Sequence, residues 1–153
     1  MREAIGGTWL FQIVIVFVLL FTGYMCLTIN HSKAFNVKNT IVKAIEREEG
    51  VNLSNPTEDE AIKKIVAYLK EASYRTTGNC PKDYIGFNRD GGLDSKNSAF
   101  CIKKEPVRSG SEFPDMSYYR VVVFYQLDLP IFNEVFNFKV TGDTKVIDVS
   151  GVS

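Results

Sequence analysis

Histidine and cysteine are scarce in this 153-residue sequence, which has one histidine, His31, and three cysteines. Cys26 lies within a long apolar run, and the other two, Cys80 and Cys101, form no C-x-x-C pair. These counts argue against a zinc site and against a Cys/His nucleophile pair. The sequence also lacks a glycine-rich phosphate loop. We therefore expect no catalytic, cofactor-binding or metal-binding residues, and a protein that is not an enzyme.

Net charge is also absent, because 18 Lys and Arg residues balance 18 Asp and Glu residues. Without a basic excess we expect no nucleic-acid partner. Aromatic residues make up 12% of the chain, which argues against disorder. Beyond the apolar run there are roughly 120 residues, enough for one domain with a buried core.

Charge is missing altogether from residues 4–30, and residues 9–29 are almost wholly apolar. A helix of about 20 such residues spans the hydrocarbon core of a bilayer, about 30 Å thick. A secretory signal peptide is the alternative, but its apolar part is typically about 7–15 residues long and ends at a small-residue cleavage site. We therefore predict a leader-like segment at 1–7, a retained transmembrane helix at 8–30 and an ectodomain at 31–153.

Gln12 is the one strongly polar side chain within the predicted span. Polar side chains in lipid are costly unless they are paired, and they often mark contacts between helices. We predict that Gln12 makes such a helix-packing contact. The alternative is that Gln12 lies one turn inside the span and reaches the interface.

The helical pattern continues beyond residue 30. Apolar residues recur at helical spacing as Ala34, Phe35, Ile41, Val42 and Ile45. The spacing predicts one helix from about residue 8 to residue 49, with Gly50 as the C′ residue that follows it. We expect the stripe to be buried against the ectodomain.

A second helix is predicted after Thr57, which forms a capping box with Glu60. Its apolar face consists of Ile62, Ile65, Val66 and Leu69.

From residue 118 the apolar period changes to two, which is typical of strands. The pattern predicts strands at about 118–128, 136–141 and 144–149, with a hairpin turn at Gly142. The expected fold class is therefore α+β. A long N-terminal transmembrane helix continues into a small ectodomain with a second helix and a three-stranded antiparallel meander.

Cys80 and Cys101 flank a segment rich in Gly, Asn, Asp and Ser. A pair of cysteines around such a loop is typical of a stapling disulfide, which persists outside the reducing cytosol. Two unrelated buried thiols are the alternative. A disulfide would place the ectodomain outside the cell.

The charges favour the opposite orientation, with the ectodomain in the cytoplasm, because more basic residues follow the apolar run than precede it.

Two segments resemble pilin-like proteins of the TadE type. One is HSKAFNVKNTIVKAIERE at 31–48, which contains an aromatic-x-V-K-N stretch, and the other is YYRVVVFYQLDLPIFNEVFNFKVTGDTKVI at 118–147. The resemblance implies a bitopic pseudopilin or minor pilin of a tight-adherence, type IV-like pilus or a related export machine. It places the N-terminus in the cytoplasm and the ectodomain outside the cell. The implied partners are the membrane, other pilin-like or pilus-assembly subunits, and a prepilin peptidase.

The resemblance also gives roles to residues near the N-terminus. Prepilins carry a short leader that ends in Gly and is removed by the peptidase; here Gly7 and Thr8 match the two sides of that site. The family usually has Glu at the fifth position of the mature chain, where this sequence has Gln12. A neutral amide can still hydrogen-bond a neighbouring subunit's amine but cannot form the ion pair, so an uncleaved anchor is an alternative.

Two hypotheses about function follow. In the first, the chain is a non-enzymatic pilin-like subunit that assembles through its N-terminal helix. In the second, it is a single-pass, surface-anchored domain that binds a ligand or partner through the loop between Cys80 and Cys101. The first hypothesis requires helix partners in the membrane, whereas the second tolerates replacement of the helix by any other anchor.

Overall fold

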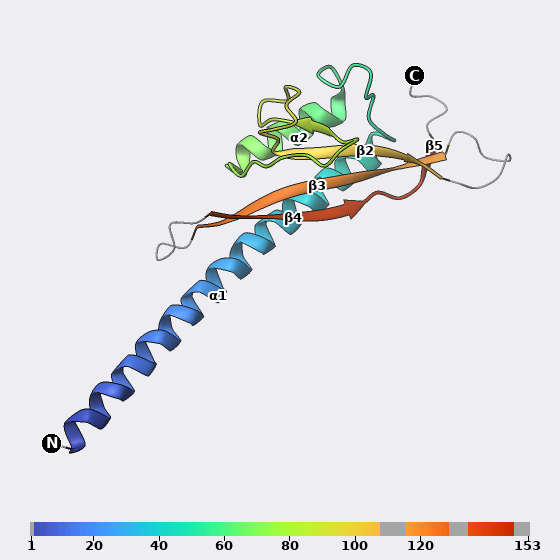
Figure 1. Ribbon diagram of the computed structural model, residues 1–153. Helices are drawn as coiled ribbons and strands as arrows, with labels where there is room; N and C mark the ends of the chain where they lie inside the picture. Colours follow the sequence, from blue (N-terminus) through green and yellow to red (C-terminus); the bar gives the residue numbers. More distant parts are fainter. Residues whose placement is uncertain (1, 108–115, 129–134, 149–153) are drawn as a thin grey trace.

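The computed structural model describes residues 2–107, 116–128 and 135–148 (Figure 1). Its elements in chain order are α1 (Arg2–Arg47), α2 (Glu60–Glu71), β1 (Ile85–Phe87), β2 (Phe100–Pro106), β3 (Met116–Asp128), β4 (Val135–Asp143) and β5 (Ile147–Asp148). Figure 1 shows that α1 extends far beyond the other elements. We call residues 8–30 of α1 the stalk, and the described residues from 31 onwards the head. The predicted α+β class, with a long apolar N-terminal helix and a second helix, is confirmed.

Helix α1 is continuous from the stalk into the head, as predicted, and it ends at Arg47. The Gly50 N–H donates to the Ile45 carbonyl at 3.0 Å, and Glu49 has a φ of 56°. This is the Schellman arrangement, in which the residue after the C-cap is left-handed. The left-handed C′ residue is therefore Glu49, and the prediction that Gly50 takes this place is wrong by one residue. At its other end α1 begins at Arg2, so the predicted leader-like segment is part of the helix.

One face of the second half of α1 is buried against the sheet. The buried side chains are Ala34, Val37, Ile41 and Ile45, all at most 3% exposed. Their spacing of three, four and four residues keeps them on one helical face. The prediction of burial is confirmed for Ile41 and Ile45, whereas Val42 is only half-buried. It is wrong for Phe35, which is 45% exposed because it is turned about 100° from Ala34 around the helix.

Helix α2 begins after Asp59, so the predicted capping box at Thr57 is wrong. One carboxylate oxygen of Asp59 accepts hydrogen bonds from the N–H groups of Ala61 and Ile62, at 2.8 and 3.3 Å. The other accepts from the Asn52 N–H at 2.8 Å, which ties the connecting segment to the helix. An aspartate at this position satisfies free N–H groups and suits the helix dipole. The predicted apolar face is present, with Val66 less buried than the rest.

The sheet is antiparallel, with the strand order β1-β2-β3-β4. The β3–β4 hairpin agrees with the first two predicted strands, and the apolar connection between them, 129–134, lies outside the described residues. Strands β1 and β2 were not predicted, so the expected meander of three strands is wrong in this detail. The sheet places β2 beside β3, on the side away from β4.

The predicted third strand is a continuation of β4 and not a new hairpin arm. Gly142 lies within β4, opposite Val121, so it is not a turn residue. β5 pairs with β3, the same partner as β4. Between the two pairings, the segment from β4 to β5 contains one residue more than the facing part of β3. The Thr144 hydroxyl accepts from the Tyr119 N–H at 2.9 Å, and the Thr144 N–H donates to the Tyr119 carbonyl. This β-bulge lets one edge of β3 stay paired along most of its length.

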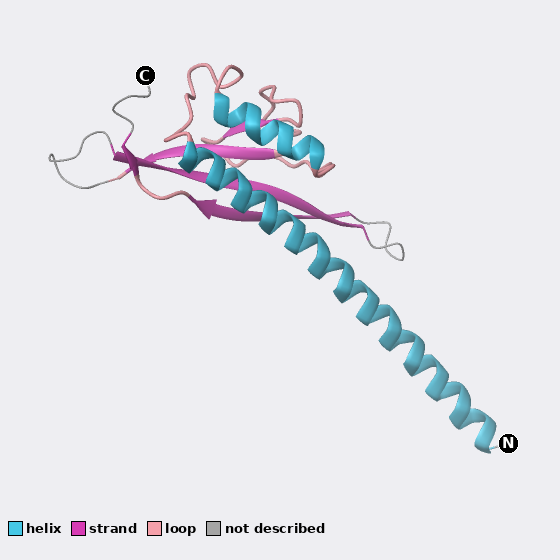
Figure 2. Cartoon of the chain, turned by 180° about the vertical axis from the view of Figure 1, so that it is seen from behind, coloured by secondary structure: helices cyan, strands magenta, loops and turns pink. Residues whose placement is uncertain are grey.

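Both helices cover the same face of the sheet (Figure 2). The main core contains the buried face of α1, four residues of α2 and the β3 side chains Tyr119, Val121 and Val123. A smaller apolar cluster on the opposite face of β3 consists of Val122 and Phe124 with Cys101. The sheet is therefore buried on two faces, although helices cover only one of them.

Candidate functional site: the stalk and its junction with the head

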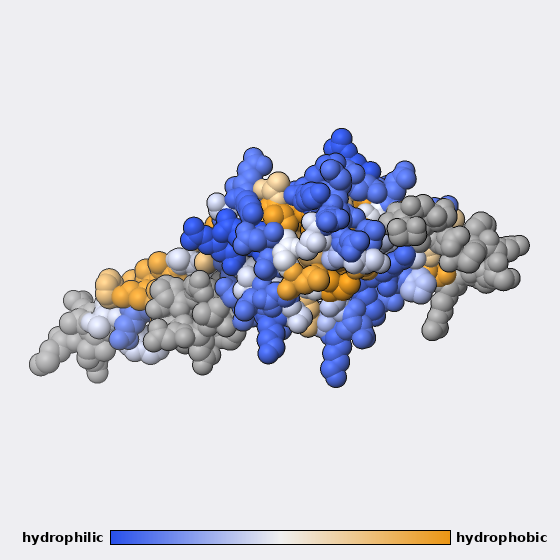
Figure 3. All heavy atoms as spheres, turned by 90° about the horizontal axis from the view of Figure 1, so that it is seen from above, coloured by the Kyte–Doolittle hydropathy of each residue, from blue (hydrophilic) through white to orange (hydrophobic). Residues whose placement is uncertain are grey.

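The stalk has no core to pack against. From Trp9 to Phe21 every large hydrophobic side chain is 43–69% exposed, and these side chains point in all directions around the helix. Within the described residues, α1 from residue 6 onwards is long and apolar enough to cross a membrane, and none of its most apolar stretch is buried. Figure 3 shows a mostly hydrophilic surface over the head and a band of hydrophobic atoms where the chain extends to the left.

Gly7, Thr8 and Gln12 lie within the first turns of α1. A side chain added at Gly7 would have no neighbour within 4 Å, so the helix is open on that side. Gln12 lines a shallow depression with Trp9, Ile13 and Val16, which share one face of the helix. These predicted site residues are close to one another, at the opposite end of α1 from the head (Figure 1).

The polar groups of the stalk differ in how they are satisfied. The hydroxyls of Thr22 and Thr28 donate to carbonyls one turn earlier, those of Val18 and Tyr24, at 2.8 and 2.9 Å. In the part of the chain that the structure describes, the side-chain amide of Gln12 has no hydrogen-bond partner. An amide without a partner on an apolar helix is available to a second molecule.

The stalk meets the head at Asn30. The side-chain amide of Asn30 donates to the Gln126 carbonyl at 3.1 Å, and it also approaches the Cys26 Sγ at 3.8 Å. The next residue, His31, packs edge-on against the ring of Tyr125, with 5.6 Å between ring centroids. We call these contacts the junction. They fix the position of β3 along α1 and were not predicted from the sequence.

The junction also completes the edge of β3. Pairing between β2 and β3 stops at Phe100 opposite Val123, so β2 provides no donors for the β3 carbonyls beyond this point. The Tyr74 hydroxyl donates to the Phe124 carbonyl, and Asn30 donates to the carbonyl two residues further on. Burial raises the pKa of Tyr74, which keeps the hydroxyl protonated and able to donate. Two side chains thus satisfy carbonyls that would otherwise be costly to leave unpaired.

Cys80 and Cys101 are joined by a disulfide, with 5.8 Å between their Cα atoms. The loop that it closes contains strand β1. Ser98, near the end of this loop, pairs with Gly78, just before its start. Cys101 is fully buried and lies on the face of the sheet away from the helices. A side chain at Gly78 would collide with the ring of Phe124, so the chain just before Cys80 packs directly on β3.

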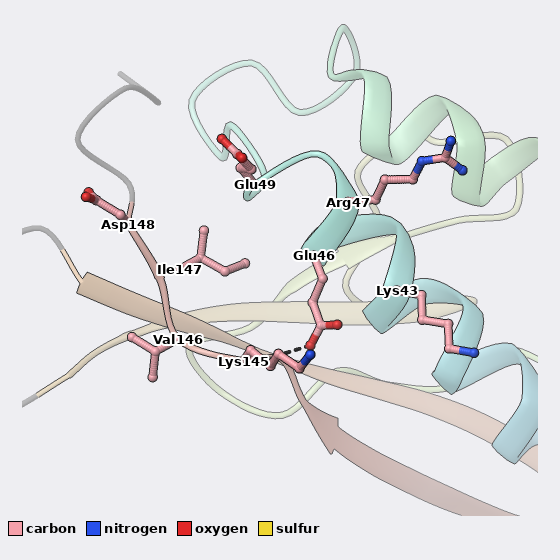
Figure 4. A pocket seen from close by; sticks show the side chains of 8 residues that line it. All are labelled: Lys43, Glu46, Arg47, Glu49, Lys145, Val146, Ile147 and Asp148. Atoms are coloured by element: carbon pink, nitrogen blue, oxygen red, sulfur yellow. Dashed lines mark hydrogen bonds between the residues drawn. The ribbon is translucent and has the colours of Figure 1, made fainter.

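A groove lies between the last turn of α1 and β5 (Figure 4). Three basic and three acidic side chains line it, together with Val146 and Ile147: Lys43, Glu46, Arg47, Glu49, Lys145 and Asp148. In this groove the Glu46 carboxylate accepts a hydrogen bond from the Lys145 N–H at 2.8 Å, which ties α1 to the segment between β4 and β5. Because the charges balance, the groove favours neither an anion nor a cation.

Comparisons of the chain with protein-family models, curated proteins and solved structures find no match. The resemblance to TadE-type proteins therefore stays a prediction. Within the described residues no group of three or more His, Cys, Asp or Glu side chains is placed to hold a metal ion. The features that single out this molecule are thus the exposed apolar stalk, its unpaired Gln12 and the junction.

Proposed function

We propose that the chain is a non-enzymatic, single-pass membrane protein that acts as a pilin-like subunit of a type IV-like pilus or related export machine. The observation that carries the proposal is a stalk that is apolar on every side and continues without a break into the head. Such a surface is stable only where lipid or other helices cover it. In this proposal the N-terminus is cytoplasmic and the head is outside the cell, which suits the disulfide.

Gln12 is the contact that we assign to assembly. Lipid tails are as apolar as a helix surface, so helices in a membrane associate through packing and polar contacts. Gln12 lines a shallow depression and its amide has no partner in the described part of the chain, whereas the stalk threonines at 22 and 28 bond within their own helix. The Gln12 side chain is therefore placed to donate to a neighbouring subunit.

Replacement of Gln12 tests the proposal directly. A photo-crosslinker placed at Val16, beside Gln12, would capture neighbouring helices in native membranes. We expect Gln12→Leu to leave insertion and head folding intact and to lower the crosslinking yield by about threefold to thirtyfold, the effect of about 0.6–2 kcal/mol for an interhelical hydrogen bond. Thr22→Val is the matched control, because its hydroxyl already bonds to Val18.

An unchanged crosslinking yield in Gln12→Leu would contradict assembly through this residue. If a chain with an unrelated apolar anchor also functions normally, the second hypothesis, a tethered binding domain, becomes the better account. One observation favours that candidate: an open groove of about 480 Å³ beside the disulfide loop. Amides, aromatic rings and two lysines, which together suit a polar, negatively charged ligand with apolar faces, are among the groups that line it: Asn79, Asn97, Gln126, Asn137, Phe124, Phe138, Lys96 and Lys139.

A further inference from the structure

We propose that the head rests on the bilayer surface through the end of the β3–β4 hairpin nearest the stalk, and that the lipid interface is the partner of this end. The inference rests on the proposed insertion of the stalk into a membrane. We call Tyr125, Gln126, Asn137 and Phe138 the hairpin end; these residues are neighbours in the β3–β4 pairing. Three observations carry the proposal: the level of the hairpin end along α1, the direction of β3, and the side chains present.

The hairpin end lies level with the last turn of the stalk. The bond from Asn30 to the Gln126 carbonyl fixes this position, and residue 30 is the last of the charge-free stretch. One turn earlier, Cys26 and Leu27 are half-buried, whereas residues 24, 25, 28 and 29 are exposed. The head therefore covers one side of the last turn of the stalk, over about 6 Å along the helix axis. If residues 8–30 cross the bilayer, this level is the lipid interface.

Strand β3 runs towards the stalk and passes the junction. Near its start, the Tyr119 hydroxyl donates to the Val51 carbonyl, just beyond the head end of α1. Seven residues later Gln126 contacts Asn30, and the pairing with β4 continues to Asp128. Two more residues of strand reach about 7 Å further. Figure 1 shows the ends of β3 and β4 on the stalk side of the head.

The side chains at the hairpin end are those that membrane interfaces favour. Tyr125 and Phe138 stack with 5.2 Å between ring centroids, and His31 meets the Tyr125 ring edge-on. Phe138 remains 39% exposed despite this stack. Tyrosine and tryptophan side chains are enriched at the level of lipid headgroups, because each has an apolar ring and a polar group. Tyr125 is of this type, and the exposed ring of Phe138 adds apolar surface at the same level. The opposite end of the head carries the balanced charges of the groove at β5.

Tryptophan fluorescence in vesicles of brominated phosphatidylcholine tests the proposal. The chain has one tryptophan, Trp9, so the wild type reports insertion of the stalk. In a Trp9→Phe background, Phe138→Trp places the only tryptophan at the hairpin end, and Val146→Trp, at an exposed site beside β5, is the matched control. We expect the probe at 138 to be quenched severalfold more than the probe at 146, and its emission to shift to the blue when vesicles are added.

The outcomes separate this inference from the proposed function. If Trp9 of the wild type is not quenched, the stalk is not in the bilayer and the proposed function fails. If Trp9 is quenched but the probe at 138 behaves like the probe at 146, the hairpin end does not touch lipid and the inference is overturned. A blue shift at 138 without bromide quenching would indicate a protein cover and would overturn it as well. Should Phe138→Trp not fold, Asn137→Trp, at a neighbouring exposed site, carries the same test.

Discussion

The two halves of α1 are one helix in two different environments. From Trp9 to Phe21 in the stalk, the large apolar side chains surround the helix and are all exposed, whereas in the head Ala34, Val37, Ile41 and Ile45 form a single buried stripe. The exposed face of the second half carries charged residues such as Lys33, Lys43 and Arg47. A helix that is apolar on all sides needs an apolar surrounding, while a helix with one apolar stripe needs only a core. The protein's own core therefore accounts for the apolar side chains of the second half of α1, whereas those of the stalk need an apolar environment outside this chain.

The change between the two halves takes place within a few residues. Asn30, the last residue of the charge-free stretch at 4–30, bonds to the head. Four residues later, Ala34 is the first fully buried side chain among the described side chains of α1. A rigid helix carries the head at a fixed distance from whatever holds the stalk. Breaking contacts in the head should therefore leave the helicity of the stalk unchanged, and substitutions in the stalk should leave the stability of the head unchanged.

The largest effect is expected from equal truncations of isoleucine in the two halves. Ile45 is fully buried and Ile13 is 55% exposed on the stalk. Ile45→Ala should lower the free energy of unfolding of the head by about 2–5 kcal/mol, because it removes core contacts and leaves a cavity. Ile13→Ala should leave head stability unchanged. Urea unfolding of the full chain in detergent micelles, followed by near-UV circular dichroism, measures both; equal effects would contradict the division of α1.

A slightly smaller effect is expected from the disulfide, which sharpens the comparison because it lies wholly in the head. Opening the Cys80–Cys101 bond by the double change to serine should lower head stability by about 3 kcal/mol, since the unfolded chain regains the freedom of the closed loop. Stalk helicity should not change. Intact mass after alkylation, with and without reductant, establishes the bond; two freely alkylated thiols in protein from native membranes would contradict it and the orientation outside the cell.

The smallest effect concerns the edge of β3 near the junction. Tyr74→Phe removes the hydroxyl that donates to the Phe124 carbonyl and should lower head stability by about 1–2 kcal/mol. Burial raises the folded-state pKa of Tyr74 above its ordinary value of about 10, so its contribution is full below pH 10 and is lost as the pH rises further.

The variant should therefore show a weaker loss of stability above pH 10 than the wild type, measured by urea unfolding across this range. Burial also raises the pKa of Tyr119, so Tyr119→Phe should change the alkaline loss of stability in the same direction and is a second test of the same effect. Identical alkaline behaviour of the wild type and Tyr74→Phe would contradict the role given to this hydroxyl.

The sequence predicted those helices and strands in which apolar residues recur at helical spacing or alternate with polar ones. The length of α1, the apolar face of α2 and the β3–β4 hairpin follow from such patterns. β2 was missed because Phe100, Cys101 and Ile102 are buried in succession on the two faces of the sheet, so no alternation is visible. The bulge at Thr144 was read as a turn because Gly and Asp are common in hairpins.

The site could be predicted only in part for a similar reason. The composition near the N-terminus points to Gln12, because one amide in an apolar run stands out. The junction joins residues that are 96 positions apart, Asn30 and Gln126, and no local pattern links them. The sheet brings these two residues together because β2 stops short and leaves β3 carbonyls for side chains to satisfy.

A spin-label scan along α1 in lipid vesicles tests the central division most directly. Single cysteines at successive positions from 10 to 47, in a Cys26→Ser background with the disulfide intact, would carry the labels. In vesicles that hold this chain alone and at low density, positions 10–21 should be uniformly more accessible to oxygen than to a water-soluble nickel chelate, since lipid then surrounds this part of the stalk on all sides. Positions 33–45 should alternate with a period of 3.6 residues. A 3.6-residue alternation in the stalk as well would mean that it lies along a surface or in a protein groove, and would contradict the account.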